Sequence, residues 1–130
     1  MKGVFRYIVI GSLILYLIWF AMPYTWVYFY EGEELNLLSW ANYGAKFDIE
    51  GPIPYIILLA YIVISIGLVL LKKWARTAFL ALTIGSVVLS GIWGFLVSPP
   101  VDAALGYIVS MSDGAILTIA YLTSLGGEFE

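Results

Sequence analysis

Two long apolar runs separated by a short basic turn constrain this chain more than any other feature. The runs are Ile53–Leu71 and Ala75–Val97, and the turn between them carries Lys72 and Lys73, with Arg76 just beyond. At about 1.5 Å of rise per residue, a helix made from either run is long enough to cross roughly 30 Å of hydrocarbon. Because the connection is so short, the two helices should be antiparallel neighbours. The sequence therefore predicts a hairpin that crosses a membrane twice.

Composition places the whole chain in the same class. Of its 130 residues, 62% are apolar and only 12% are charged, which is typical of an integral membrane protein. Two further apolar stretches, Val4–Met22 and Val101–Leu125, bring the predicted spans to four. The first follows a short basic region, as a signal peptide does, but no small-x-small cleavage pattern follows it, so we expect it to be retained. The predicted fold is an all-α membrane protein, a four-helix transmembrane bundle that forms one domain over residues 1–130.

The basic residues predict the orientation of this bundle. With four spans, Lys2, Arg6 and the three basic residues near the central turn fall on one side, and only Lys46 falls on the other. Cytoplasmic segments carry the excess of Lys and Arg in membrane proteins. Both termini are therefore predicted to be cytoplasmic.

The outer loop, residues 24–51, is the one sizeable polar connection. Its aromatic run Tyr24–Tyr30 and its alternating segment Lys46–Glu50 favour strands, and the leucines between them favour a short interfacial helix. The predicted outer cap is therefore strand, short helix, strand. Its aromatic residues fit either an interfacial belt or a platform for a partner. The candidate partner residues are Trp26, Tyr28, Tyr30 and Trp40.

The basic turn has two interpretations. Lys72, Lys73 and Arg76 fit anionic lipid headgroups or an acidic partner, or they only set the topology, with Trp74 as an interfacial anchor. Three basic residues do not support binding to nucleic acid. The acidic residues of the outer loop match no calcium-binding spacing, so we predict no metal site.

The third predicted helix carries small side chains on one face. Thr83, Ser86, Ser90 and Gly94 follow one another at three- and four-residue spacing. Small residues let helix backbones approach closely in lipid, so we expect this face to meet another helix.

Asp113 is the residue that the sequence singles out. It lies eleven residues beyond Asp102, which places it about 16 Å deeper along a continuous helix, near the bilayer midplane. A carboxylate there costs on the order of 3 kcal/mol, and an ionisable residue inside the membrane is a functional hypothesis by default. We expect hydroxyl donors, a cationic partner on another chain, or protonation to reduce this cost. The predicted polar site consists of Asp113, Ser110, Ser112, Gly114, Ser86 and Ser90, with a tyrosine as a further candidate donor.

Three roles for Asp113 remain open from the sequence: helix packing, docking to another subunit, and handling of a proton, ion or ligand. A break of the helix at Ser112–Gly114 is the alternative to a continuous span. The continuous helix is preferred because the eleven residues that would remain, Ala115–Leu125, are too few to cross.

The absence of histidine and cysteine narrows the function. It excludes disulfides, haem attachment and the usual Ser-His or Cys-His catalytic sets, so no catalytic residue and no cofactor are predicted. We predict a non-catalytic accessory or structural subunit of a larger membrane complex or homo-oligomer. The alternatives are a small transport or lipophilic-ligand-binding bundle that uses Asp113 in a polar cavity, and an enzyme that uses Asp113 with Ser110 or Ser112.

One resemblance supports the membrane class. The Lys-Lys-Trp-Ala-Arg turn between two apolar helices and the later segment Asp113-Gly114-Ala115-Ile116-Leu117 resemble a pattern in small four-span bacterial inner-membrane proteins of uncharacterised family. The resemblance covers about Ile53–Leu122. It implies a bacterial inner-membrane location and carries no function with it.

Overall fold

The computed structural model describes residues 1–41, 43–46, 51–94 and 96–130. Within these residues the chain is helical and contains no strand. The elements, in order, are α1 (Lys2–Phe29), α2 (Glu33–Leu38), α3 (Ile53–Val69), α4 (Lys73–Ser90), α5 (Pro100–Leu122) and the 3-10 helix η1 (Ser124–Glu128).

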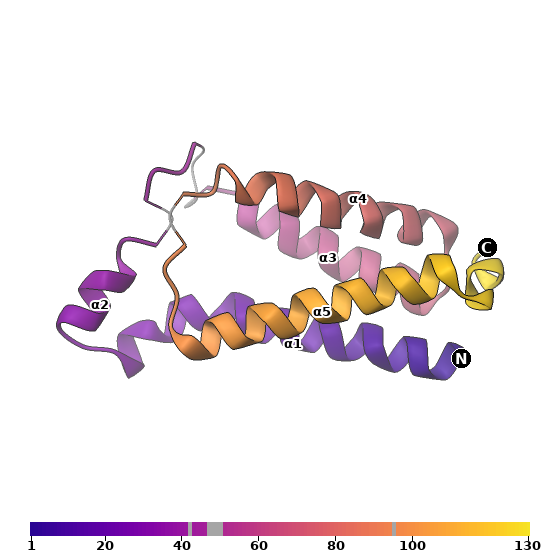
Figure 1. Ribbon diagram of the computed structural model, residues 1–130, viewed down its shortest axis with the longest axis horizontal. Helices are drawn as coiled ribbons and strands as arrows, with labels where there is room; N and C mark the ends of the chain where they lie inside the picture. Colours follow the sequence, from indigo (N-terminus) through magenta and orange to yellow (C-terminus); the bar gives the residue numbers. More distant parts are fainter. Residues whose placement is uncertain (42, 47–50, 95) are drawn as a thin grey trace.

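The four long helices form an antiparallel bundle (Figure 1). α1 packs along α5, and the α3–α4 hairpin packs against this pair, with α3 on α1 and α4 on α5. Both chain termini and the α3–α4 turn lie at one end, whereas α2 lies at the other. The predicted antiparallel hairpin and the placement of both termini at the same end are therefore confirmed.

The core is concentrated at the end that carries the termini. Aromatic and aliphatic side chains from all four long helices meet there, and the segment after α5 folds back to cover them. Its main members are Phe5, Val9, Tyr61, Leu68, Phe79, Ile116, Ala120 and Phe129.

The tight α3–α4 turn depends on Gly67. A Cβ atom at this position would lie 2.6 Å from the Cβ of Ala75 and 2.8 Å from the Trp74 ring, so only glycine fits without movement. Leu71 completes the turn with φ of 56°, a left-handed conformation that is uncommon for residues other than glycine.

α1 is longer than predicted, and the strand predicted at Tyr24–Tyr30 is wrong. The helix continues through Pro23 to Phe29. Proline removes one backbone donor from the helix. The Thr25 hydroxyl bonds the Met22 carbonyl at 2.7 Å, and the last turns of the helix bring Trp26 to Asp102. Strand preference depends strongly on context, and here these tertiary contacts favour the helix.

The rest of the predicted outer cap is only partly described. The predicted short helix exists as α2. Of the second predicted strand, Lys46–Glu50, only Lys46 belongs to the described residues, and residues 47–50 lie outside them.

Two helix ends also differ from the prediction. α4 ends at Ser90 and not at Val97, because Gly91 ends the helix and Gly94 adopts φ of 95°, which favours glycine. α5 ends at Leu122 and not at Leu125, because Thr123 is extended and its side chain caps the Leu125 amide.

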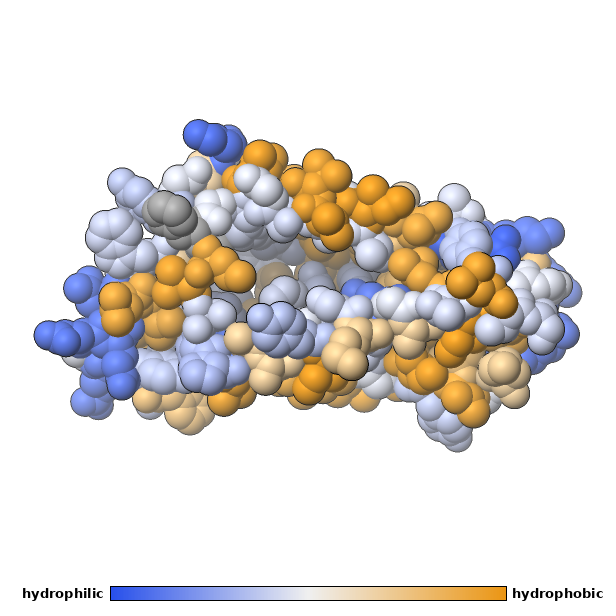
Figure 2. Space-filling view, viewed as in Figure 1, coloured by the Kyte–Doolittle hydropathy of each residue, from blue (hydrophilic) through white to orange (hydrophobic). Residues whose placement is uncertain are grey.

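Two helices, α1 and α5, are long and apolar enough to cross a membrane by length and composition. α3 is apolar but has only 17 residues, and α4 begins with Lys73 and Arg76 in its first turn. On the face drawn in Figure 2, apolar groups occupy patches along the body of the bundle, whereas the most hydrophilic groups gather mainly toward its two ends.

Candidate functional site

A hydrogen-bonded polar cluster lies inside the bundle. The Tyr61 hydroxyl donates to Asp113 Oδ1 at 2.7 Å, and the Ser12 hydroxyl donates to the same oxygen at 3.2 Å. The Ser12 and Tyr61 oxygens are themselves 2.7 Å apart. The three side chains come from α1, α3 and α5, so this cluster, which we call the Asp113 network, connects three helices.

Packing fixes the geometry of the Asp113 network. Ser12 and Tyr61 are only 2% and 3% exposed. The Tyr16 ring stacks on the Tyr61 ring at 4.2 Å with an interplanar angle of 11°, and Phe79 contacts the Tyr61 ring at a centroid distance of 5.9 Å. These rings hold the Tyr61 hydroxyl in place toward the carboxylate.

The two oxygens of Asp113 differ in their surroundings. Both hydroxyl groups bind Oδ1, and no described residue donates a hydrogen bond to Oδ2. Asp113 is half-buried, and its Oδ2 is not fully enclosed by the protein. The carboxylate therefore offers one oxygen to the bundle and keeps the other accessible.

Asp113 accepts hydrogen bonds from hydroxyl groups, as predicted, but none of the four predicted serines is a donor to it. Ser110 and Ser112 bond the carbonyls of Gly106 and Ile108 on their own helix, each at 2.9 Å. Ser90 bonds the Val87 carbonyl, and Ser86 is exposed on α4. A tyrosine donor was predicted, and Tyr61 supplies it.

Ser12 belongs to the Asp113 network but is not among the residues predicted from the sequence. The signal was present, because Ser12 is the one hydroxyl of a serine or threonine within the apolar run Tyr7–Met22. Its depth matches that of Asp113 only after α1 and α5 are aligned as antiparallel neighbours.

α5 is continuous through Ser112, Asp113 and Gly114, so the preferred unbroken helix is confirmed. The two glycines Gly106 and Gly114 of α5 differ in how closely other helices approach them. A Cβ at Gly106 would lie 3.4 Å from the Trp19 ring, which marks close helix packing, whereas nothing lies within 4 Å of one at Gly114.

A second buried carboxylate lies at the start of α5. Asp102 is 3% exposed, and its Oδ2 accepts a hydrogen bond of 2.9 Å from the Trp26 indole. Its Oδ1 is buried without a partner among the described residues. Trp26 therefore makes a contact inside the molecule. This differs from the interpretation of the sequence in which Trp26 belonged to an exposed aromatic platform.

The other residues of that predicted platform do not converge. Tyr28 is 82% exposed near the end of α1, whereas Trp40 follows α2 and contacts the Tyr43 ring at 5.1 Å. Tyr30 follows α1 and is half-buried.

Arg76 at the basic turn faces inward. Its Nη1 donates to the Gly126 carbonyl at 3.0 Å, and its guanidinium lies over the rings of Tyr121 and Phe129. The other three residues of the predicted headgroup site, Lys72, Lys73 and Trp74, are exposed and face outward.

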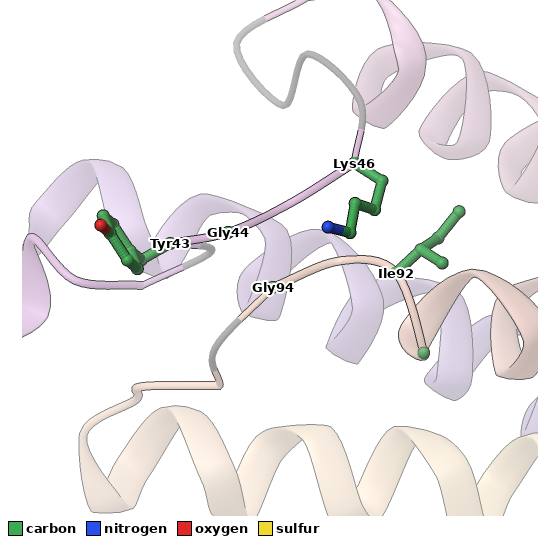
Figure 3. Close-up of a pocket in the computed structure, with 6 residues that line it drawn as sticks. Tyr43, Gly44, Lys46, Ile92 and Gly94 are labelled. Carbon is green, nitrogen blue, oxygen red and sulfur yellow. The ribbon is translucent and has the colours of Figure 1, made fainter.

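The opposite end of the molecule contains an open pocket of about 330 Å³ (Figure 3). The Lys46 amide donates to the Ile92 carbonyl at 3.0 Å, which joins the loop after α2 to the loop after α4. The Lys46 side chain turns back over the space between these loops. The lining residues are Tyr43, Gly44, Lys46, Gly91, Ile92 and Gly94.

One side of the bundle is open toward this end. On α4, Ala75 and Phe79 are buried, but Ser86 and Ser90, which lie further along the same helix face, are exposed. The predicted helix contact of the Ser86–Ser90 face is therefore not made by the described part of the chain. The surface is hollowed between α4 and α5 on the side nearer α2 (Figure 2). We call this region the α4–α5 opening.

Within the described residues, no group of three or more acidic, histidine or cysteine side chains is placed to hold a metal ion. Comparison of the chain with protein-family models, with curated proteins and with solved structures found no match.

Proposed function

We propose that this chain is a non-catalytic subunit of a larger assembly in a bacterial inner membrane, with four membrane-crossing helices and both termini in the cytoplasm. The α4–α5 opening is the side that it presents to the assembly. The observation that carries this proposal is the exposure of Ser86 and Ser90. They lie on the same face of α4 as Ala75 and Phe79, which are buried nearer the α3–α4 turn.

The outer surfaces of α3 and α4 support four crossings. On α3, Leu59, Val63 and Ile66 turn large apolar side chains away from the bundle, with exposed fractions of 47 to 63%. On α4, Val87 and Val88 are each 69% exposed. Such surfaces are stable in lipid, whereas a large contiguous apolar surface in water promotes association. A helix somewhat shorter than the hydrocarbon is accommodated by local thinning of the bilayer.

The distribution of charge supports the orientation. Lys2, Arg6 and the basic turn all lie at the end that holds both termini, and Lys46 alone lies at the other end. This distribution is the one that the excess of basic residues on the cytoplasmic side predicts.

The open side supports a partner because an unfilled helix interface is costly in a bilayer. Helices associate in lipid through close packing, for which small residues such as Ser86 and Ser90 are suited. Within the chain, α5 leaves these residues uncovered. A helix from another polypeptide would complete the packing.

The proposal is tested by mild extraction from native membranes of a chain tagged at its exposed amino terminus. We expect a stoichiometric membrane partner, and we expect its recovery to fall in Ser86→Phe, which fills the opening. Leu59→Phe is the matched control, because Leu59 is 63% exposed on α3, which does not border the opening, and its replacement should leave recovery unchanged.

Two outcomes would contradict the proposal. One is a wild-type chain that elutes alone. The other is a partner whose recovery responds equally to Ser86→Phe and Leu59→Phe. A bound amphiphile in place of a protein would favour the alternative function, a bundle that binds lipophilic ligands.

A further inference from the structure

The free oxygen of Asp113 indicates the chemistry of the partner, on the basis of the proposed function. Residues seven apart lie on nearly the same side of a helix. On α5, Asp113 lies seven residues before Ala120, whose carbonyl is contacted by Arg76 of α4. Asp113 therefore lies on the same side of α5 as Ala120, about 10 Å from it along the helix. On the neighbouring α4, the exposed Ser86 lies about 15 Å from Arg76, so Asp113 and Ser86 are at similar levels.

No cation of this chain reaches the Asp113 carboxylate. The chain has six basic residues, and all are described. Lys2, Arg6, Lys72, Lys73 and Arg76 lie at the end with the termini, and Lys46 lies near α2. The donors on Oδ1 are neutral hydroxyl groups, so the negative charge of Asp113 has no counter-charge within the chain.

A second copy of the chain cannot supply the missing cation. Copies in one membrane share the same orientation, so the basic residues of a neighbour would lie at the same two levels and not at that of Asp113. A counter-charge for an ionised Asp113 would therefore have to come from a different molecule.

We infer that a transmembrane helix of a different protein occupies the α4–α5 opening and places a Lys or Arg side chain on Asp113 Oδ2. Charge complementarity is the reason for the cation, because charged residues within the membrane pair with one another. The hydroxyl-bearing faces of both walls favour a helix, because small residues permit close approach of a helix backbone. Ser110 on α5 and Ser86 and Ser90 on α4 are the exposed serines of the two helices that border the opening.

Asp113→Asn tests the charge without removing the Asp113 network. The amide oxygen of asparagine still accepts hydrogen bonds from Tyr61 and Ser12, so the fold should remain, while the charge at Oδ2 is lost. We expect partner recovery from native membranes to fall about tenfold, with the unfolding midpoint of the isolated chain nearly unchanged. Ser112→Ala on the same helix is the control, because Ser112 bonds only its own helix, and recovery should stay at the wild-type level.

A photo-cross-linking amino acid at Ser90 provides a second measurement that does not depend on recovery. We expect it to capture a peptide from a membrane span that contains Lys or Arg. In a charge-exchange experiment, Asp113→Lys is combined with replacement of the partner's basic residue by an acidic one. The pair should recover more of the partner than Asp113→Lys alone.

The outcomes separate this inference from the proposed function. Unchanged recovery in Asp113→Asn, or a captured span without a basic residue, would overturn the inference while the subunit role stands. Capture of a second copy of the chain, or of a lipid, would overturn it as well. A wild-type chain that brings no partner would instead overturn the proposed function.

Discussion

At the scale of single residues, the molecule is organised around a hydroxyl group and not only around an acid. The Tyr61 hydroxyl lies 2.7 Å from both Ser12 Oγ and Asp113 Oδ1, and so it links the side chains of three helices. The sequence predicted Asp113 from its depth alone. It did not predict Ser12 or select Tyr61, because their proximity depends on the rotation of three helices relative to one another. Serines on α5 itself were weaker candidates than expected, since a helical serine readily bonds the carbonyl four residues back.

Tyr61→Phe should therefore destabilise the bundle although it removes a single oxygen. The substitution takes away a donor to Asp113 and the contact with Ser12, and hydrogen bonds in membrane proteins contribute about 0.6 to 2 kcal/mol each. We expect the free energy of unfolding in detergent to fall by about 1 to 2 kcal/mol. Tyr107→Phe is the matched control, because Tyr107 is 72% exposed. Equal effects of the two substitutions would show that the Asp113 network contributes nothing to stability.

At the scale of elements, the connections decide the fold more than the helices do. The sequence predicted the α3–α4 hairpin well, because a basic turn between two apolar runs leaves few other arrangements. It predicted the ends of α1 and α4 poorly. The first helix was predicted to end at Met22, but it continues through Pro23 to Phe29, and Trp26 in its last turns bonds Asp102. The glycines after Ser90 end α4 within an apolar run. Local signals compete with tertiary contacts at such positions, and the sequence alone does not show which prevails.

Gly67→Ala tests the closeness of the hairpin. The added methyl group would lie 2.6 Å from the Ala75 side chain, so α3 and α4 must move apart. Overpacking of this kind costs about 1 to 3 kcal/mol, which we expect to measure as a loss of unfolding free energy. Gly85→Ala on α4 has open space around it and should be neutral or stabilising, since alanine favours the helix by about 1 kcal/mol. An unchanged free energy of unfolding in Gly67→Ala would mean that α3 and α4 are packed less closely at the turn than this distance indicates.

At the scale of the whole molecule, the two ends of the bundle are closed differently. At the end with the termini, Phe129 is 2% exposed and meets the Phe5 ring edge-on at 5.8 Å. The Glu130 amide bonds the Leu71 carbonyl at 2.9 Å, and the Lys73 amide bonds the Glu130 carbonyl at 2.8 Å. These contacts fasten the last segment to the α3–α4 turn. The all-helical class was predictable from apolar run lengths, but this closure was not, because it joins residues far apart in the sequence.

Phe129→Ala should loosen that closed end. Removal of a buried aromatic side chain costs about 3 to 5 kcal/mol, and the loss should appear as faster hydrogen exchange at the Lys73 and Glu130 amides. Glu128→Gln is the control within the same segment. It breaks the exposed 2.8 Å ion pair with Lys2, which should contribute less than about 1 kcal/mol. Fast exchange at these amides in the wild type would contradict the closure.

The Gly67–Ala75 contact has a mechanical consequence for α4. A rod of 18 residues is about 27 Å long, so a tilt of about 5° at its anchored base displaces its far tip by about 2 Å. The close packing at Gly67 therefore determines where Ser90 lies, because any change in the angle between α3 and α4 at the turn is largest at the far end of α4.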